Sequence, residues 1–443
     1  MNKNDITLVH FFINPHGTAI PTGCLTLIAS LKKHNFSVDF RDLQLLKTRK
    51  RLKLENMISF FKGSANIIGI SCYSHVLPYV IKVAQKIKQE APQKTIILGG
   101  IGPTLVAKLI LDNFSHIDII VLGDGQDTLP VLLKTIKENR NGLDSVKGIA
   151  YRKDSVTIFT QTRETLPSLS NSLVPAFSSV DLKPYNSASI LLAQGCPFKC
   201  PFCCIPKFNQ QHKKRDLNIV KEEILYLSRQ NNTISHFNLI DEAFLRDKSR
   251  VYNFLSFSGK KKFRNKINFN CYGRIDLMNN KIIRDLGMNN FSIYYGIESG
   301  SNNVLKKIKK GFTKEQAIKI LLYSKKYCKV VFASFIYGFP FESKDDFLST
   351  LFYHRYLTYR KISSQLRLLC PLPGTELYRL FINKLRFSQG IISNVCLPQI
   401  DIAAIKKMLI KYPYIFPTFY HYKSPSLQYK LSIMHKTCGD VIS

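Results

Sequence analysis

Hydrophobic and polar positions alternate in two long series along the chain, and each series predicts strands alternating with helices. In the first 140 residues, short apolar runs are separated by stretches in which apolar residues recur every three or four positions. The expected strands are Ile6–Ile13, Ser37–Arg41, Ile67–Cys72, Thr95–Leu98 and Ile117–Leu122. The expected helices are Thr22–Lys33, Leu77–Glu90, Pro103–Asn113 and Gln126–Glu138. Buried strands between amphipathic helices predict a doubly wound, Rossmann-like parallel sheet over residues 1–140.

A break in this periodicity predicts a connector over residues 141–185. Lys147–Gln161 alternates like a β-hairpin with Lys153–Ser155 at its tip. The following Ser-, Pro- and Leu-rich stretch, Leu166–Pro184, keeps neither the helical nor the strand period. We therefore place a domain boundary here.

From Ser187 onward the alternation restarts with six further units. The expected strands are Ala188–Ala193, His236–Ile240, Lys266–Arg274, Phe291–Ile297, Val330–Tyr337 and Ser364–Leu369. The expected helices are Leu217–Arg229, Lys248–Phe257, Lys281–Leu286, Lys314–Lys326, Lys344–Tyr359 and Thr375–Lys384. Six repeats predict a partial (β/α)6 barrel over residues 186–385. The tail, residues 386–443, has one helical segment, Asp401–Tyr412, and an aromatic stretch, Tyr414–Tyr422, and is expected to form a small cap.

Composition indicates a folded protein of more than one domain. The chain has 443 residues, of which 45% are hydrophobic and 21% charged, as in folded globular proteins. Its apolar runs are far shorter than the roughly 18 residues of a membrane helix, so no membrane span is expected. Its N-terminus lacks the parts of a secretory signal, and we expect a cytoplasmic protein.

The net charge is +34, from 64 Lys and Arg against 30 Asp and Glu. Such an excess favours acidic partners, whether nucleic acid, an acidic peptide or an anionic membrane surface. The basic residues are scattered, however, and no RNA- or DNA-binding motif accompanies runs such as Lys47–Lys53 and Lys260–Lys266. Solvated surface lysines explain the same composition, so nucleic acid is a partner without support from a motif.

Three of the eleven cysteines form one tight group, Cys196, Cys200 and Cys203. They follow the first strand of the second series, in a loop that also contains two prolines and a glycine. Three thiolates at this spacing suit an iron–sulfur cluster with one open iron. A structural zinc ion is the alternative, with His212 as its fourth ligand, although the paired CxxC knuckles of zinc sites are absent.

This CxxxCxxC loop, with the aromatic Phe202 before its last cysteine, resembles that of the radical S-adenosylmethionine (SAM) superfamily. The resemblance continues in order at the ends of later strands. Asn238–Phe244 resembles the family's acidic motif, Gly296–Gly300 its ribose motif, Ser334–Glu342 its adenine motif, and Pro371–Glu376 the turn after strand six.

The resemblance implies a [4Fe–4S] cluster on the three cysteines and SAM bound beside it. In this family the acidic motif, here Asp241 and Glu242, contacts the methionyl amine, and Glu298 would accept the ribose hydroxyls. Arg274, at the end of strand three, is a candidate for the methionyl carboxylate. The remaining candidates for contact with SAM are Phe202, Ser299, Ser334, Ile336 and Gly338.

The N-terminal series resembles the cobalamin-binding-type domain fused to many radical enzymes. The residues expected at a cobalamin site are Ser71, Gly99, Gly100 and Gly123, which follow successive strands. Asn14-Pro15-His16 lies where some cobalamin proteins keep an Asp-x-His-x-x-Gly motif, but the Asp is missing and Ala19 replaces the Gly. His16 is therefore not expected to bind cobalt.

The family resemblance implies reductive cleavage of SAM to a 5′-deoxyadenosyl radical, with cobalamin-dependent methylation of an unactivated carbon or phosphorus centre. A cobalamin-independent peptide maturase or epimerase is the second hypothesis, in which Cys370 would return a hydrogen atom to the substrate radical. A basic, zinc-containing nucleic-acid-binding protein is the third. The expected partners are an acidic small-molecule or peptide substrate and an external electron donor such as flavodoxin or ferredoxin.

Overall fold

A computed structural model places the chain in two compact units, which are described separately. The structure describes residues 3–12, 18–46, 53–138, 140–163, 169, 172–208, 211–230, 234–260, 263, 266–388, 402–424 and 426–438. His16 and its two preceding residues lie outside these ranges.

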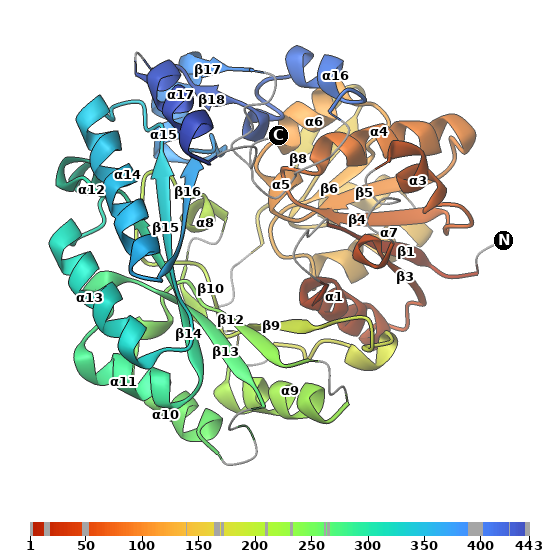
Figure 1. Cartoon of the computed structure of the whole chain (residues 1–443). Helices are drawn as coiled ribbons and strands as arrows, with labels where there is room; N and C mark the ends of the chain where they lie inside the picture. The colour runs from red at the N-terminus through yellow and green to blue at the C-terminus, as the bar shows by residue number, and fades with distance from the viewer. Residues whose placement is uncertain are drawn as a thin grey trace. The chain divides into compact units, whose positions relative to one another are not determined.

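The first unit is built on a seven-stranded sheet in the order β3-β1-β4-β5-β6-β7-β8 (Figure 1). Its first five members in this order are parallel and the last two antiparallel. The strands are β1 (Ile6–Phe11), β3 (Val38–Asp42), β4 (Ile67–Cys72), β5 (Thr95–Gly99), β6 (Ile119–Val121), β7 (Ile149–Lys153) and β8 (Val156–Phe159). The doubly wound sheet expected from the sequence is thus confirmed, and the predicted hairpin extends it.

Helices pack on both faces of this sheet. The strand residues that point toward either face are therefore mostly apolar and buried. The helices of the first unit are α1 (Thr22–Lys33), α3 (Leu54–Ser59), α4 (Leu77–Glu90), α5 (Ile101–Thr104), α6 (Ala107–Asn113), α7 (Thr128–Glu138) and α16 (Lys406–Lys411). The single helix predicted over Pro103–Asn113 is wrong. The chain leaves helical geometry at Val106, whose φ is −130°, and two short helices form instead.

The second unit contains six parallel strands in the order β16-β15-β14-β13-β12-β9. They are β9 (Ser187–Leu191), β12 (His236–Ile240), β13 (Asn268–Gly273), β14 (Phe291–Glu298), β15 (Val331–Tyr337) and β16 (Ser363–Leu368). Because consecutive strands pair in sequence order, the six units wind in one direction as the predicted partial barrel requires. No pairing between β9 and β16 is present among the described residues, so the barrel is open on that side.

The helices of the second unit follow its strands, and most of them lie on the outer face of this curved sheet (Figure 1). They are α8 (Ile205–Phe208), α9 (Leu217–Gln230), α10 (Lys248–Ser258), α11 (Asn280–Met288), α12 (Asn302–Lys307), α13 (Lys314–Tyr327), α14 (Lys344–Tyr359), α15 (Glu376–Phe381) and α17 (Leu427–Cys438). Two of them begin at capping boxes, in which Thr313 and Ser343 exchange hydrogen bonds with residues three positions later. Two short antiparallel pairs complete the unit: β10 (Ala193–Gln194) with β11 (Lys213–Lys214), and β17 (Leu385–Arg386) with β18 (His421–Tyr422).

The division of the chain differs from the predicted boundaries in two places. The hairpin and residues 172–184 belong to the first unit, so residues 141–185 are not a separate connector. The tail is divided as well, because residues 402–417 pack with the first unit and residues 418–438 with the second. The ring of Tyr412, for example, lies 4.9 Å from that of Phe114.

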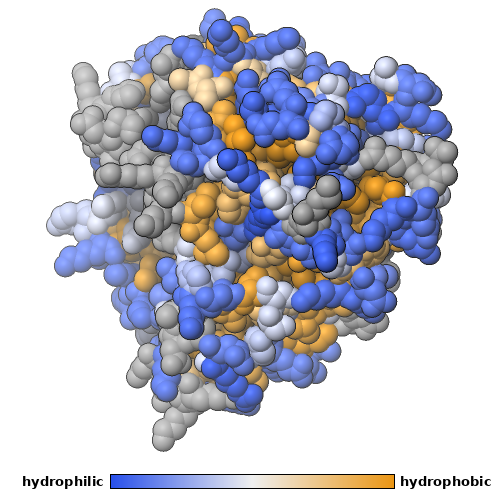
Figure 2. Space-filling view, turned by 90° about the vertical axis from the view of Figure 1, so that its right-hand side faces the viewer, coloured by the Kyte–Doolittle hydropathy of each residue, from blue (hydrophilic) through white to orange (hydrophobic). Residues whose placement is uncertain are grey.

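No helix in the described part of the chain combines the length and the apolar character that crossing a membrane requires. Figure 2 shows hydrophilic side chains spread over the viewed face, with hydrophobic ones scattered between them.

Candidate functional site

The loop with the three cysteines follows β10 in the second unit. It starts at Gly195, whose φ of +79° turns the chain, and it closes on itself where the Cys203 N–H donates to the Cys200 carbonyl at 3.1 Å. All three thiols are free and partly buried. Backbone N–H groups of Phe198 and Ile205 donate to the sulfurs of Cys196 and Cys203. Backbone donors that point at sulfur suit thiolate ligands, whose charge they stabilise.

Burial in this loop disfavours the charged thiolate, so thiolates here would need a compensating positive charge such as that of a bound metal. Burial raises the pKa of Cys203 to about 12 and also raises the pKa of Cys196. Cys200 interacts electrostatically with both, so the three sulfurs lie near one another. The described residues contain no group of three His, Cys, Asp or Glu side chains placed to hold a single metal ion. Each cysteine of an iron–sulfur cluster binds its own iron, so its sulfurs need not meet at one point.

Arg274, which follows β13, brings a positive charge to this loop. Its guanidinium lies 3.6 Å from the centre of the Phe198 ring, a cation–π contact, and Nη1 lies 3.8 Å from Cys200 Sγ. Its other nitrogens bind Asp276 at 3.0 Å and the Lys310 carbonyl at 2.7 Å. These contacts hold the charge beside the cysteines.

Two acidic residues follow β12 and differ in their surroundings. Asp241 is buried, accepts the Ala243 N–H at 2.9 Å, and lies 3.0 Å from His212 Nε2. Glu242 has its pKa raised by burial and by the charge of Asp241, and it interacts electrostatically with Cys196 and Cys203. His212, the candidate fourth zinc ligand, therefore pairs with Asp241. A positively charged group between Glu242 and the cysteines would find a matching charge there.

Glu298, the candidate ribose ligand, sits in a distorted part of β14. The register with β15 shifts between Gly296 and Glu298, and Glu298 has a φ of +71°, which is rare for a residue other than glycine. Its carboxylate lies 3.3 Å from the ammonium of Lys310, and both side chains are almost fully buried. Strained backbone held by a buried partner is typical of functional sites.

The candidate adenine residues lie on β15 and the turn after it. Ser334 and Ile336 alternate with the fully buried Ala333 and Phe335, so they share the opposite face of the strand. Ser334 Oγ accepts a hydrogen bond from Gln365 at 3.0 Å.

The turn itself begins at Gly338, whose φ is +86°. Phe339, the next residue, contacts the ring of Phe202 from the cysteine loop, with 6.0 Å between ring centres. Ser299, next to Glu298, is fully buried and bonded to Thr350 of α14 at 3.1 Å.

In the first unit, the four residues expected at a cobalamin site line one cavity of about 50 Å³. Ser71, Gly99, Gly100 and Gly123 reach it from the carboxyl ends of β4, β5 and β6, where α/β sheets bind ligands. An added Cβ would meet no atom within 4 Å at Gly99 or Gly123. At Gly100 it would lie 2.8 Å from the Cys72 carbonyl oxygen, and φ is +96°, so only glycine fits there. The glycines thus leave space at this edge that side chains would fill.

Comparison with known proteins matches both halves of the chain. A sequence model of the B12-binding domain matches residues 11–133, and a model of the radical SAM superfamily matches residues 190–353. The chain therefore contains a radical SAM domain. Its radical SAM domain follows a B12-binding domain, as the motifs in the sequence indicated.

Similarity to individual proteins extends over different shares of the chain. An uncharacterized methyltransferase of Pyrococcus horikoshii is 24% identical over 82% of this chain and 78% of the relative. Anaerobic magnesium-protoporphyrin IX monomethyl ester cyclase of Synechocystis is 32% identical, but the match covers only 40% of this chain and 36% of the relative. Among solved structures, the radical SAM methyltransferase TsrM of Kitasatospora setae has a TM-score of 0.73 at 16% identity, covering 98% of this chain and 88% of that one.

The radical SAM domain brings together most of the predicted site residues, because they follow adjacent parallel strands. Cys370 follows β16 of the same sheet, is partly buried and interacts electrostatically with Tyr422; its catalytic role stays a prediction. Sequence reasoning missed Lys310 and Thr350, whose side chains contact the ribose motif. It also missed Lys430, which binds the adenine turn from α17. The apolar spacing of Leu427, Leu431 and Met434 was the available signal for α17.

Proposed function

We propose that the chain is a cobalamin-dependent radical SAM methyltransferase acting on an unactivated carbon or phosphorus centre of a biosynthetic substrate. The gathering of the thiol triplet, Glu242 and Arg274 at the carboxyl edge of one sheet carries this proposal. The glycine-lined cavity of the B12-binding domain supports its cobalamin-dependent part. The similar proteins include the methyltransferase of Pyrococcus horikoshii and the solved structure of TsrM.

The residues present fit the expected groups. Cys196, Cys200 and Cys203 would hold a [4Fe–4S] cluster, and Gly99, Gly100 and Gly123 would let part of a cobalamin molecule approach the backbone at their sheet edge. When bound, the cluster and SAM supply an adenosyl radical, and cobalamin supplies the methyl group.

The chain's own side chains then bind and orient SAM. The carboxylate of Glu242 would attract the methionyl ammonium, while Arg274 keeps positive charge beside Cys200 for the methionyl carboxylate. Glu298 would accept ribose hydroxyls, held in place by Lys310. Phe202 and the turn that begins at Gly338 would border the adenine of SAM at the same edge of the sheet.

The substrate and the electron donor are expected to be acidic. The charge of +34 raises the local concentration of anionic molecules and disfavours cationic ones. An acidic substrate or peptide, and an acidic donor such as flavodoxin or ferredoxin, match this field.

Anaerobic reconstitution of the full chain with iron, sulfide and hydroxocobalamin tests the proposal. We expect bound iron, cobalamin retained through gel filtration, and formation of 5′-deoxyadenosine from SAM under reduction. Cys200→Ala should abolish cleavage, whereas Cys204→Ala, a matched control at the neighbouring buried thiol, should retain it. A metal content of one zinc ion per chain and no iron would contradict the assignment as a radical SAM enzyme. SAM cleavage without retained cobalamin would contradict the methyltransferase and favour a peptide maturase or epimerase.

A further inference from the structure

The C-terminal helix α17 packs against the part of the radical SAM domain that follows β15. Leu427, Leu431 and Met434 lie on one face of the helix and are buried. They form a cluster with Tyr337 of β15, Phe347 and Leu351 of α14, and Leu368 of β16. The helix therefore packs at the carboxyl end of the strand that carries the adenine motif.

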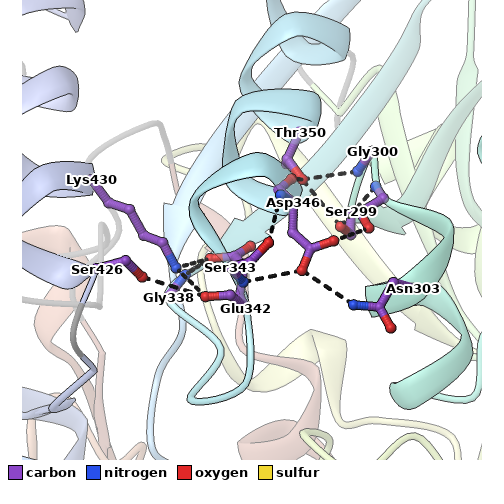
Figure 3. A network of polar contacts seen from close by, with 11 residues as sticks. Ser299, Gly300, Asn303, Gly338, Glu342, Ser343, Asp346, Thr350, Ser426 and Lys430 are labelled. Carbon is purple, nitrogen blue, oxygen red and sulfur yellow. Dashed lines mark hydrogen bonds and ion pairs between the residues drawn. The ribbon is translucent and has the colours of Figure 1, made fainter.

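A lysine projects from the same face of α17 into this apolar contact. Lys430 has no exposed surface, and neither has the side chain of its partner, Glu342. The Lys430 ammonium lies 2.7 Å from Glu342 Oε2 and 3.0 Å from the Glu342 carbonyl oxygen (Figure 3). A buried ion pair of this kind is costly to form, and removing one partner leaves an uncompensated buried charge.

Glu342 closes the turn that begins at Gly338. Its Oε2 accepts the Gly338 N–H at 2.8 Å, and its own N–H donates to the Phe339 carbonyl at 3.0 Å. Its second carboxylate oxygen, Oε1, is buried and has no hydrogen-bond partner among the described residues. Burial raises the pKa of Glu342, and the charge of Lys430 opposes this rise. Lys430 thus supplies the positive charge that stabilises the Glu342 carboxylate, and this carboxylate accepts the hydrogen bond from the Gly338 N–H.

The same turn reaches both neighbouring parts of the candidate site. Phe339 contacts Phe202 of the cysteine loop. Ser343, directly after Glu342, donates its N–H to Asp346 Oδ2 at 3.0 Å. Asp346 also accepts a hydrogen bond from Ser301 and one from Asn303, and both residues follow the ribose motif. Figure 3 shows the contact with Asn303. A shift of this turn would therefore disturb the packing at the cysteine loop and the hydrogen bonds beside the ribose motif.

We propose that Lys430 is a positioning residue for SAM binding. Its ammonium holds the Glu342 carboxylate, and through it the Gly338–Glu342 turn, in the conformation that receives the adenine of SAM. The inference deepens the proposed function and rests on it. It gives the C-terminal helix a role in SAM binding.

The test uses the full chain with its cluster reconstituted, and measures the dissociation constant of SAM by equilibrium dialysis. The variants are Lys430→Met, Glu342→Gln and the double substitution. Lys344→Met is the matched control, because Lys344 lies 5.0 Å from the ring of Tyr429 on α17 and does not pair with Glu342 in the described part of the chain. Melting curves check folding, and the EPR spectrum of the reduced cluster, with and without SAM, reports SAM at the cluster independently of turnover.

We expect each single substitution to weaken SAM binding about 10-fold, and the double substitution to return to within about threefold of wild type. The recovery is expected because the glutamine oxygen still accepts the Gly338 N–H and no buried charge remains. The control should bind SAM as wild type does, and the SAM-induced EPR change should weaken in the single variants only.

Wild-type affinity in Lys430→Met would overturn the inference, and so would a double variant as weak as the sum of the single effects. If Lys430→Met fails to fold, the comparison of Glu342→Gln with the double variant decides. A wild-type chain that does not bind SAM at all would instead overturn the proposed function itself.

Discussion

Thr350 of α14 offers a sharp test of how the ribose motif is supported. Its hydroxyl has one proton and two acceptor positions, and all three are used in a fully buried environment. It donates to the Asp346 carbonyl at 2.9 Å, so it must accept from the Gly300 N–H at 3.0 Å and from the Ser299 hydroxyl at 3.1 Å. Thr350→Val keeps the shape of the side chain and leaves two buried donors without a partner.

The expected cost follows from these two orphaned donors. A buried donor without an acceptor costs about 1–3 kcal/mol, so with two such donors Thr350→Val should lower the free energy of unfolding of the radical SAM domain by about 2–6 kcal/mol. Thr350→Ser keeps the hydroxyl and loses one methyl group, which costs about 1 kcal/mol. The difference between the two variants isolates the hydrogen bonds from the lost packing.

Urea unfolding followed by far-UV circular dichroism measures both variants, because the chain has no tryptophan to report by fluorescence. Dissociation constants for SAM, measured on cluster-reconstituted protein, should rise for the valine variant and stay near wild type for the serine variant. Equal stability of Thr350→Val and Thr350→Ser would refute this account of the ribose motif.

Three further outcomes are expected. Burial lowers the pKa of His75 to about 4 from its usual 6.5. Between pH 4 and pH 6.5, the unfolded chain therefore binds a proton at His75 that the folded chain does not. Acidification from pH 7 to pH 5 should therefore cost about 2 kcal/mol more in wild type than in His75→Leu, measured by urea unfolding at both pH values; parallel losses would contradict this. Gly99→Val should fill open space beside the cavity and abolish cobalamin retention through gel filtration without unfolding the chain, whereas Gly23→Ala, in α1, should retain it. The affinity for an acidic substrate should fall severalfold between low and physiological ionic strength, and a flat salt response in binding assays would show that the net charge has no role in recognition.

The sequence alone determined the order of elements and the chemistry of the main site. Period-two and period-3.6 patterns located strands such as β4 and β12, and helices such as α4 and α14, at their observed bounds, because each buries a continuous apolar face. The cysteine triplet and the residues at strand ends were visible because parallel strands bring their carboxyl ends to one edge. Local spacing is sufficient for such features.

The tertiary structure alone decided which charged residues are paired and buried. Lys310 and Lys430 are two among 64 basic residues, and nothing in their local sequence separates them from solvated lysines. Their partners, Glu298 and Glu342, lie 12 and 88 positions away along the chain. Whether a lysine is buried depends on which helix packs over it, and α17 reaches its place only through contacts with distant strands. The same reason explains why the tail divides between the two units, since its neighbours are set by packing and not by its own pattern.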